Sequence, residues 1–166
     1  MSILEILKYP DPRLKQESTV VEVFDEMLLT FIKDLEETMR AGPGGVGIAA
    51  PQVGHFKRIV IVDVSARKNT PNNGCMVLIN PELIKWEGLK VGREGCMSVP
   101  DFTGNVIRAE QIVLKASDSQ GQPCEFSCEG YEARAVQHEI DHLNGLLFLD
   151  RLVSRRNDLF KRKSYK

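Results

Sequence analysis

The sequence predicts an α+β fold in which mainly antiparallel sheets pack around a central helix that carries a His-Glu-x-x-His (HExxH) motif. Three observations predict it: an amphipathic segment near the N-terminus, several short β-branched segments broken by Gly and Pro, and a second amphipathic segment late in the chain. Over residues 25–40 apolar side chains recur every three or four positions, and Gly42-Pro43 ends this N-terminal amphipathic helix. A single helical turn is expected earlier, at residues 13–16.

The strands are expected after this helix. Residues 59–64 are rich in Ile and Val and predict a buried strand, and strand character resumes at residues 77–79. Gly and Pro separate the strands that follow, so these are expected to be short, at residues 83–87, 89–93, 105–117 and 124–129.

Two helices are expected to complete the chain. The HExxH helix covers residues 132–143, and Asn144-Gly145 forms its left-handed C-terminal cap. A basic C-terminal helix is expected from Ser154. Because no segment resembles a long linker, residues 1–166 are interpreted as one domain.

The composition is that of an ordinary globular protein. Charged residues make up 27% and hydrophobic residues 42% of the 166 residues, which excludes disordered and collagen-like chains. The net charge is -1, so the whole molecule is not a polyanion binder. No apolar run approaches the roughly 20 residues that cross a bilayer, and Glu5 and Lys8 interrupt any secretory leader. We therefore expect no membrane association and a cytoplasmic location, where the four cysteines are thiols or metal ligands.

A metal site is predicted by the segment at residues 138–142, which contains two of the three histidines. His138 and His142 are four residues apart, so their Cβ atoms lie about 5–6 Å from each other on one helix face. Two such imidazoles can bind one cation at about 2.0–2.1 Å. Glu139 follows the first ligand directly and flanks the metal without binding it, which suits a base that takes a proton from water. Exposed helix histidines are the simpler alternative, but the apolar neighbours place the pair at the inner edge of the helix.

A catalytic metal site needs a third protein ligand and an open position. One zinc-peptidase pattern has its third histidine six residues after the second, where this chain has Phe148. The third ligand is therefore expected upstream, and Cys96 is the best candidate. Cys75 is interpreted as a small buried residue. Cys124 and Cys128 are too far apart on a strand to chelate a metal, at about 13 Å.

A glycine-rich segment at residues 44–52 formally contains the dinucleotide pattern Gly-x-Gly-x-x-Ala. That pattern normally follows a strand and opens a helix, whereas here a helix precedes it and Pro51 follows at once. No nucleotide cofactor is therefore expected. The segment is interpreted as a tight loop that exposes backbone groups and presents the amide of Gln52, which suits stabilisation of an oxyanion.

Three motifs together resemble the peptide deformylases. These are GVGIAAPQ at residues 45–52, EGCMSVP at residues 94–100 and QHEIDH at residues 137–142, in this order and spacing. The likeness extends to ILKYPDPRL near the N-terminus, to LINP at residues 78–81 and to FLDRL at residues 148–152, and so covers nearly the whole chain. The pattern is most similar to the bacterial-type members of that family.

The resemblance implies a hydrolase that removes the formyl group from the N-terminal methionine of nascent polypeptides and releases formate. It implies that Cys96, His138 and His142 hold one divalent metal ion, natively Fe(II), with Zn(II), Ni(II) or Co(II) as alternatives. It also implies that Glu139 is the general acid and base.

The family likeness further implies how substrate is held. The side chain of Gln52 and the backbone N–H of Met97 would stabilise the oxyanion. The extended N-formyl-methionyl peptide would pair with backbone groups of Val46, Gly47 and Gly95. We also expect Arg134 and Ala135, one turn before the first histidine, to border the methionine pocket.

Two other functions stay open on the residues alone: a zincin-like metallopeptidase, and a non-catalytic metal-binding module. Formate release without internal cleavage separates deformylation from the first. Loss of activity on replacement of Glu139 separates it from the second.

The C-terminal tail suggests a partner. Residues 151–166 contain seven basic residues and one acidic residue. The substrate of the family emerges from a ribosome, whose RNA surface is a polyanion. We therefore hypothesise that this tail docks on the ribosome.

Overall fold

The computed structural model describes residues 2–162, whose strands form one antiparallel six-stranded sheet. The strand order is β1-β2-β3-β4-β5, and β6 pairs with β4. Two α-helices and three short 3-10 helices accompany the sheet, so the α+β prediction with an antiparallel sheet is confirmed. The strands are β1 Gly47–Ala49, β2 Ile59–Val62, β3 Met76–Cys96, β4 Val99–Ser117, β5 Pro123–Glu129 and β6 Leu159–Lys161. The helices are η1 Pro12–Lys15, α1 Glu26–Ala41, η2 Ala50–Val53, α2 Gly130–Leu143 and η3 Phe148–Arg151.

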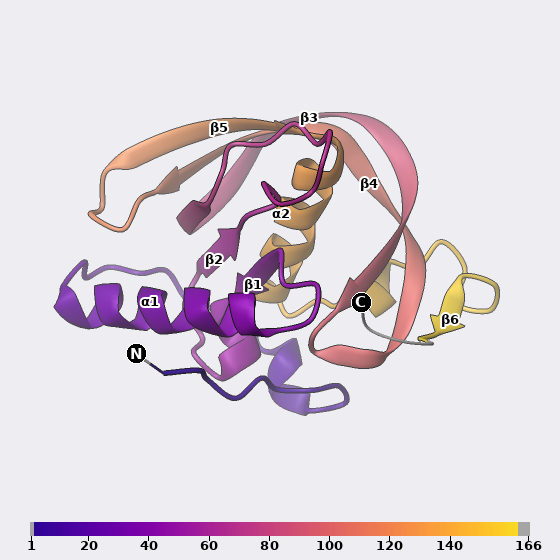
Figure 1. Ribbon diagram of the computed structural model, residues 1–166, viewed down its shortest axis with the longest axis horizontal. Helices are drawn as coiled ribbons and strands as arrows, with labels where there is room; N and C mark the ends of the chain where they lie inside the picture. The colour runs from indigo at the N-terminus through magenta and orange to yellow at the C-terminus, as the bar shows by residue number, and fades with distance from the viewer. Residues whose placement is uncertain (1, 163–166) are drawn as a thin grey trace.

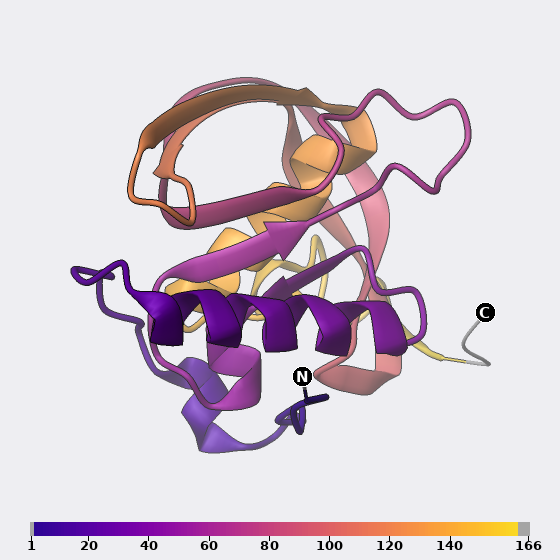
Figure 2. The same ribbon diagram turned by 60° about the vertical axis from the view of Figure 1, so that its left-hand side comes forward.

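The helix α2 lies inside the curve of β3, β4 and β5, and β1, β2 and α1 lie on its other side (Figures 1 and 2). Three register shifts between β3 and β4, within residues 79–96, allow this curvature, because a bulge bends its strand and increases its twist. Strand β3 is continuous from Met76 to Cys96, so the prediction of separate strands at residues 77–79, 83–87 and 89–93 is wrong. Gly88 has a φ of 72° and interrupts the pattern, yet the strand continues through it.

Strand β2 is buried on both faces, which explains its unbroken Ile and Val sequence. Ile59 and Ile61 pack in the cluster that contains the apolar face of α1. Val60 and Val62 pack in the cluster that contains the apolar face of α2. Because successive side chains of a strand point to opposite faces, one short strand joins the two helical layers.

Both predicted α-helices are present. Asp25 caps α1 by accepting a hydrogen bond from the Leu28 N–H, and the helix ends at Ala41, one residue beyond the predicted end. The helix α2 begins at Gly130, two residues before its predicted start. Of the predicted left-handed cap Asn144-Gly145, only Gly145 is left-handed, with a φ of 74°, whereas Asn144 has a φ of -100°. A Cβ at Gly145 would also collide with the Lys15 backbone, so no larger residue fits.

The predicted C-terminal helix is wrong for residues 154–162. A turn at residues 155–157 leads into β6, which pairs with residues 102–104 of β4. Strand β5 pairs only with residues 111–117 of β4, so β6 occupies backbone groups that would otherwise be exposed at that edge. The Asn105 side chain ties the segment down by donating to Asp158 Oδ1 at 2.8 Å. Residues 163–166 of the predicted helix lie outside the described residues.

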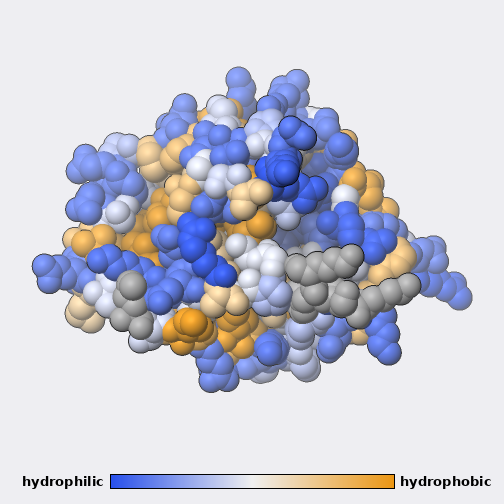
Figure 3. Space-filling view, in the orientation of Figure 1, coloured by the Kyte–Doolittle hydropathy of each residue, from blue (hydrophilic) through white to orange (hydrophobic). Residues whose placement is uncertain are grey.

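Apolar side chains of the described residues gather in three buried clusters. On the face shown in Figure 3, hydrophobic residues lie in patches between hydrophilic ones. Within residues 2–162 no helix combines the length and the apolar composition that a membrane crossing needs.

Candidate metal centre

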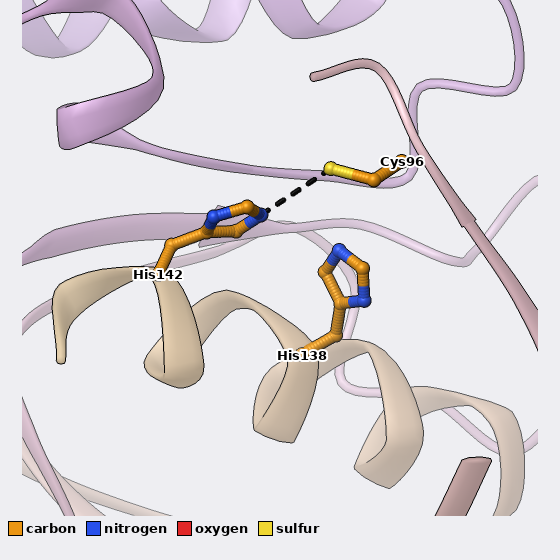
Figure 4. A group of neighbouring side chains, drawn as sticks. All are labelled: Cys96, His138 and His142. Carbon is orange, nitrogen blue, oxygen red and sulfur yellow. Dashed lines mark hydrogen bonds between the residues drawn. The ribbon is translucent and has the colours of Figure 1, made fainter. Parts of the chain in front are cut away.

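Cys96, His138 and His142 converge in the interior. Their sulfur and nitrogen ligand atoms all lie within 4.8 Å of one another, and all three residues are buried. The Cys96 Sγ and His142 Nε2 atoms are 3.3 Å apart, and both imidazoles extend from α2 toward the cysteine (Figure 4). The structure therefore brings together the three residues predicted as metal ligands.

The fold fixes each of these side chains by its place in an element. Cys96 is the last residue of β3 and pairs with Val99 across a two-residue turn. His138 and His142 lie one turn apart on α2, with ring centroids 5.1 Å apart and ring planes at 72°. Strand and helix thus supply ligands from opposite sides.

The donor set fits a divalent transition metal. Metal bonds of about 2.3 Å to sulfur and 2.0–2.1 Å to nitrogen, at a tetrahedral angle, separate the two donor atoms by about 3.5 Å. The observed Sγ–Nε2 distance of 3.3 Å is close to that separation. Burial lowers the pKa of His142 well below its ordinary value, so its imidazole is neutral and able to ligate. A soft thiolate with two imidazoles suits Zn(II) and Fe(II).

Glu94 orients the first imidazole. Its Oε1 lies 2.9 Å from His138 Nδ1, and since a carboxylate only accepts, Nδ1 donates. Burial alone would lower the pKa of His138, but hydrogen bonds with Cys96 and Glu94 raise it well above its ordinary value, so a cation at Nε2 would displace a proton. Burial alone would raise the pKa of Glu94, but hydrogen bonds from His138 and Arg108 outweigh it and hold the pKa well below the usual range. Sequence analysis missed Glu94, although its position two residues before Cys96 puts both on the same face of a strand.

A buried ion network extends from Glu94 to the far side of the helix. Arg108 on β4 donates to both Glu94 oxygens at 2.9 Å and to Asp141 Oδ2 at 2.6 Å. Arg151 donates to both oxygens of the same Asp141 at 2.8 and 3.0 Å. Asp141 immediately precedes His142, so the network holds the ligand-bearing turn of α2 against β3 and β4. Arg108, Asp141 and Arg151 were not singled out from the sequence, because their partners come from distant segments.

Glu139 is buried and lines a cavity beside the ligand set. Burial raises its pKa to about 7, and among the described residues its Oε1 atom has no hydrogen-bond partner. Gly47 allows this arrangement, since a Cβ at that position would stand 2.6 Å from Glu139 Oε2. A buried carboxylate with a pKa near neutrality and a free oxygen is suited to proton transfer.

Gln52 presents its amide nitrogen to the same site. Its Oε1 accepts from the Ala49 N–H at 2.9 Å, which turns the NH₂ group toward the other side. There Nε2 lies 3.0 Å from Ser98 Oγ and 3.5 Å from Cys96 Sγ. The amide nitrogen is thus held beside the ligand set, and its role as an oxyanion donor stays a prediction.

A cavity of about 230 Å³ opens onto these groups. Eight of the nine predicted site residues line it, and the ninth, His142, lies buried beside Cys96. Arg134 and Ala135 also line it, as expected for the border of the pocket. The predicted site residues that line the cavity are Val46, Gly47, Gln52, Gly95, Cys96, Met97, His138 and Glu139. Six further lining residues had been given no role in the site, and these are Pro43, Gly44, Arg93, Glu94, Tyr131 and Arg162.

The cysteines outside the site need one correction. None of the four cysteines, all of which belong to the described residues, forms a disulfide. Cys75, however, is exposed, and its interpretation as a buried residue is wrong. It ends the polar loop that precedes β3, and burial begins only at Met76.

Comparison with known proteins gives one consistent result. A sequence model of the polypeptide deformylase family matches residues 3–158. A peptide deformylase of Desulfotalea psychrophila is 44% identical over 163 residues, covering 98% of this chain and 95% of that protein. The crystal structure of a peptide deformylase from Legionella pneumophila has a TM-score of 0.85 and 42% identity, covering 93% of this chain and 89% of that chain. A class I type b peptide deformylase from Acinetobacter baumannii, solved with Met-Ala-Ser bound, has a TM-score of 0.84 and 38% identity, covering 92% of this chain and 100% of that chain.

Proposed function

This chain belongs to the polypeptide deformylase family of enzymes, and from that premise we propose that it removes the formyl group from the N-terminal methionine of nascent polypeptides and releases formate. The observation that carries the proposal is the convergence of Cys96, His138 and His142 beside the carboxylate of Glu139, in one cavity. The helix that bears the HExxH motif would then be the central catalytic element.

We propose that Cys96, His138 and His142 hold one divalent cation, natively Fe(II), with Zn(II), Ni(II) or Co(II) able to replace it. A cation held there would act as a Lewis acid toward water and the formyl oxygen. Glu94 would keep the His138 imidazole in the tautomer that binds through Nε2.

Glu139 would move the proton. Its carboxylate takes a proton from the water that attacks the formyl carbon, and its acid form then gives that proton to the leaving amine nitrogen. A new C–O bond forms, the C–N bond breaks, and the products are formate and a free N-terminal amine. The pKa of about 7 that burial gives Glu139 suits both halves of this exchange near neutral pH.

Gln52 and Met97 would stabilise the negative charge on the formyl oxygen. The Gln52 Nε2 atom is held beside Cys96, and the Met97 backbone follows the ligand directly in the chain. Loss of one such donor typically costs about 10²–10³ in rate. A Gln52→Ala variant should therefore lose turnover while it keeps its cation.

The extended peptide would pair with the backbones of Val46, Gly47 and Gly95, which line the cavity. The Met-Ala-Ser peptide bound by the Acinetobacter relative supports this class of ligand. We further propose that residues 1–166 act as a single catalytic domain, that no nucleotide cofactor takes part, and that the enzyme works in the cytoplasm without binding a membrane.

The test is formate release from formyl-Met-Ala-Ser by protein loaded anaerobically with Fe(II), and separately with Zn(II). We expect formate and free α-amine in equal amounts, with no cleavage inside the peptide. Glu139→Gln should lower kcat by about 10²–10⁴-fold and leave the bound cation unchanged, because the carboxylate is not a ligand. The matched control is Glu129→Gln, a change at the exposed residue that precedes the same helix.

Other outcomes would replace the proposal. Cleavage within the peptide would indicate a zincin-like metallopeptidase. A stable, cation-loaded protein that releases no formate would indicate a non-catalytic metal-binding module. A cation content that falls together with the activity of Glu139→Gln would make Glu139 a ligand.

A further inference from the structure

We propose that Arg93 and Arg162 form a cationic rim at the mouth of the metal cavity and select formylated peptides that carry an acidic side chain shortly after the methionine. The inference rests on the proposed deformylase function and concerns the part of the substrate beyond the reacting residue. Both arginines line the cavity, and they come from segments far apart in the sequence.

Strand β6 places Arg162 at the cavity. Its backbone N–H donates to the Asp101 carbonyl at 2.8 Å, which continues the pairing of β6 with β4. A Cβ on Gly95 would collide with Arg162 Nη2, so the guanidinium lies directly against the Gly95 backbone. The C-terminal segment therefore reaches the groove in which the substrate backbone is proposed to pair.

The same strand holds Arg93. The Arg93 guanidinium carbon lies 3.7 Å from the centroid of the Phe160 ring, a cation–π contact. Its Nε donates to Asn105 Oδ1 at 3.1 Å, and its Nη1 donates to Thr103 Oγ1 at 3.3 Å. Because side chains alternate along a strand, Phe160 and Arg162 extend to the same side of the β6 segment. One segment thus positions both arginines.

The charge of the rim is positive. Of the acidic side chains that line the cavity, Glu94 is buried and bonded to Arg108, Arg134 and His138. Glu139, the other acidic lining residue, is buried beside the metal ligands. Arg93 is exposed and Arg162 half-buried, so their charge acts on what enters from solvent.

The rim lies where downstream residues of the peptide would pass. A bound strand advances about 3.3 Å per residue, and alternate side chains face the same way. A peptide paired with Gly95 therefore carries the side chains that follow its methionine past Arg93 and Arg162. Asp or Glu there would accept charge-assisted hydrogen bonds, whereas Lys or Arg would be repelled.

The experiment measures kcat/KM for formate release from formyl-Met-Ala-Ala-Ala and from versions with a single Glu or Lys at position two, three or four. At one position or more, the Glu peptide should be favoured over the Lys peptide by about three- to tenfold at low salt, because each exposed charge pair contributes modestly. The preference should lie mainly in KM and should shrink as salt is added. Arg162→Gln and Arg93→Gln should each reduce the Glu/Lys ratio, and the double variant should bring it close to one.

Arg156→Gln is the matched control, since Arg156 belongs to the same tail, is exposed and does not line the cavity. Its Glu/Lys ratio should equal that of the unchanged protein. A ratio near one in the unchanged protein, or a ratio that Arg162→Gln leaves intact, would overturn this inference alone if the neutral peptide still yields formate. Failure to release formate from the neutral peptide would overturn the proposed function and this inference with it.

Discussion

The two sides of the cavity are built in different ways. On the inner side, Glu94 and Arg108 are 5% and 4% exposed at their side chains, and each makes several ion pairs or hydrogen bonds to other buried groups. On the outer side, Arg93 is exposed and contacts the ring of Phe160 and two polar side chains of β4. The inner side would hold the proposed reacting groups in one geometry, whereas the outer side faces solvent and, on our proposal, the substrate.

On the proposed function, this difference would let one fold separate chemistry from selectivity. Buried ions that lose a partner are costly, so the inner network tolerates little change without loss of the fold. Exposed charges contribute less, so the rim can change its preference for substrate while the metal centre stays intact. Substitutions on the inner side should therefore change stability, and those on the outer side should change substrate preference with a smaller effect.

The largest expected effect is on the free energy of unfolding, and it should differ between two arginines that both bond to Asp141. Arg108 is 4% exposed, and Arg151 is 47% exposed. Arg108→Met should lower the free energy of unfolding by about 3 kcal/mol, because it removes one partner from a buried ion network. Arg151→Gln should lower it by about 1 kcal/mol or less.

Denaturant unfolding of both variants, with the same cation at the same concentration, measures this pair of changes. The slope of the free energy against denaturant should stay constant, so that the shift in midpoint reports stability. Equal losses for Arg108→Met and Arg151→Gln would contradict the distinction between a buried and an exposed side of the network.

The next effect tests whether the inner side acts on the metal. Glu94→Gln keeps the shape of the side chain but removes the charge that faces His138, Arg108 and Arg134. Metal affinity or kcat/KM should fall by about 10–100-fold, the usual cost of losing the partner of a ligating histidine. Titration with Zn(II) measures the affinity, and Glu87→Gln, an exposed change on the same strand, is the control. If both the affinity and kcat/KM are unchanged, Glu94 serves the fold alone.

The fold was predictable where one segment carries its own signal. The apolar period of α1 and the Ile-Val run of β2 are local patterns, and each appears where it was expected. The continuity of β3 was not predictable, because regular pairing with β4 on both sides of Gly88, Glu87 with Gln111 and Leu89 with Ala109, carries the strand past this glycine. The C-terminal segment was misassigned for the same reason. Its charges suit a helix end, but its backbone pairs with an edge of β4 that no local pattern reveals.

The candidate site, too, was predictable only where a local motif carries the signal. The HExxH spacing and the EGCMSVP motif predicted the three residues that converge, because their positions depend on a helical turn and a short motif. Arg108 gave no such signal, since it meets Glu94 and Asp141 only after β4 has folded against β3 and α2. Arg162 lies far along the chain from Gly95 and reaches it through β6. The supporting and selecting residues thus depend on tertiary structure, which motif spacing does not encode.

The smallest expected effect concerns ribosome docking by the basic tail, which we retain as a proposal. The structure divides the tail, since Arg162 lines the cavity while Arg155, Arg156 and Lys161 are exposed. Replacing these three exposed residues by Gln should weaken co-sedimentation with ribosomes a few-fold at low salt. The dependence of binding on salt should also become weaker, because the slope of log affinity against log salt falls by about one for every phosphate that the protein no longer neutralises. Turnover of formyl-Met-Ala-Ser should stay unchanged, since none of the three lines the cavity. Unchanged co-sedimentation would contradict docking through this surface, and a fall in turnover with intact co-sedimentation would assign these residues to the outer side of the active site instead.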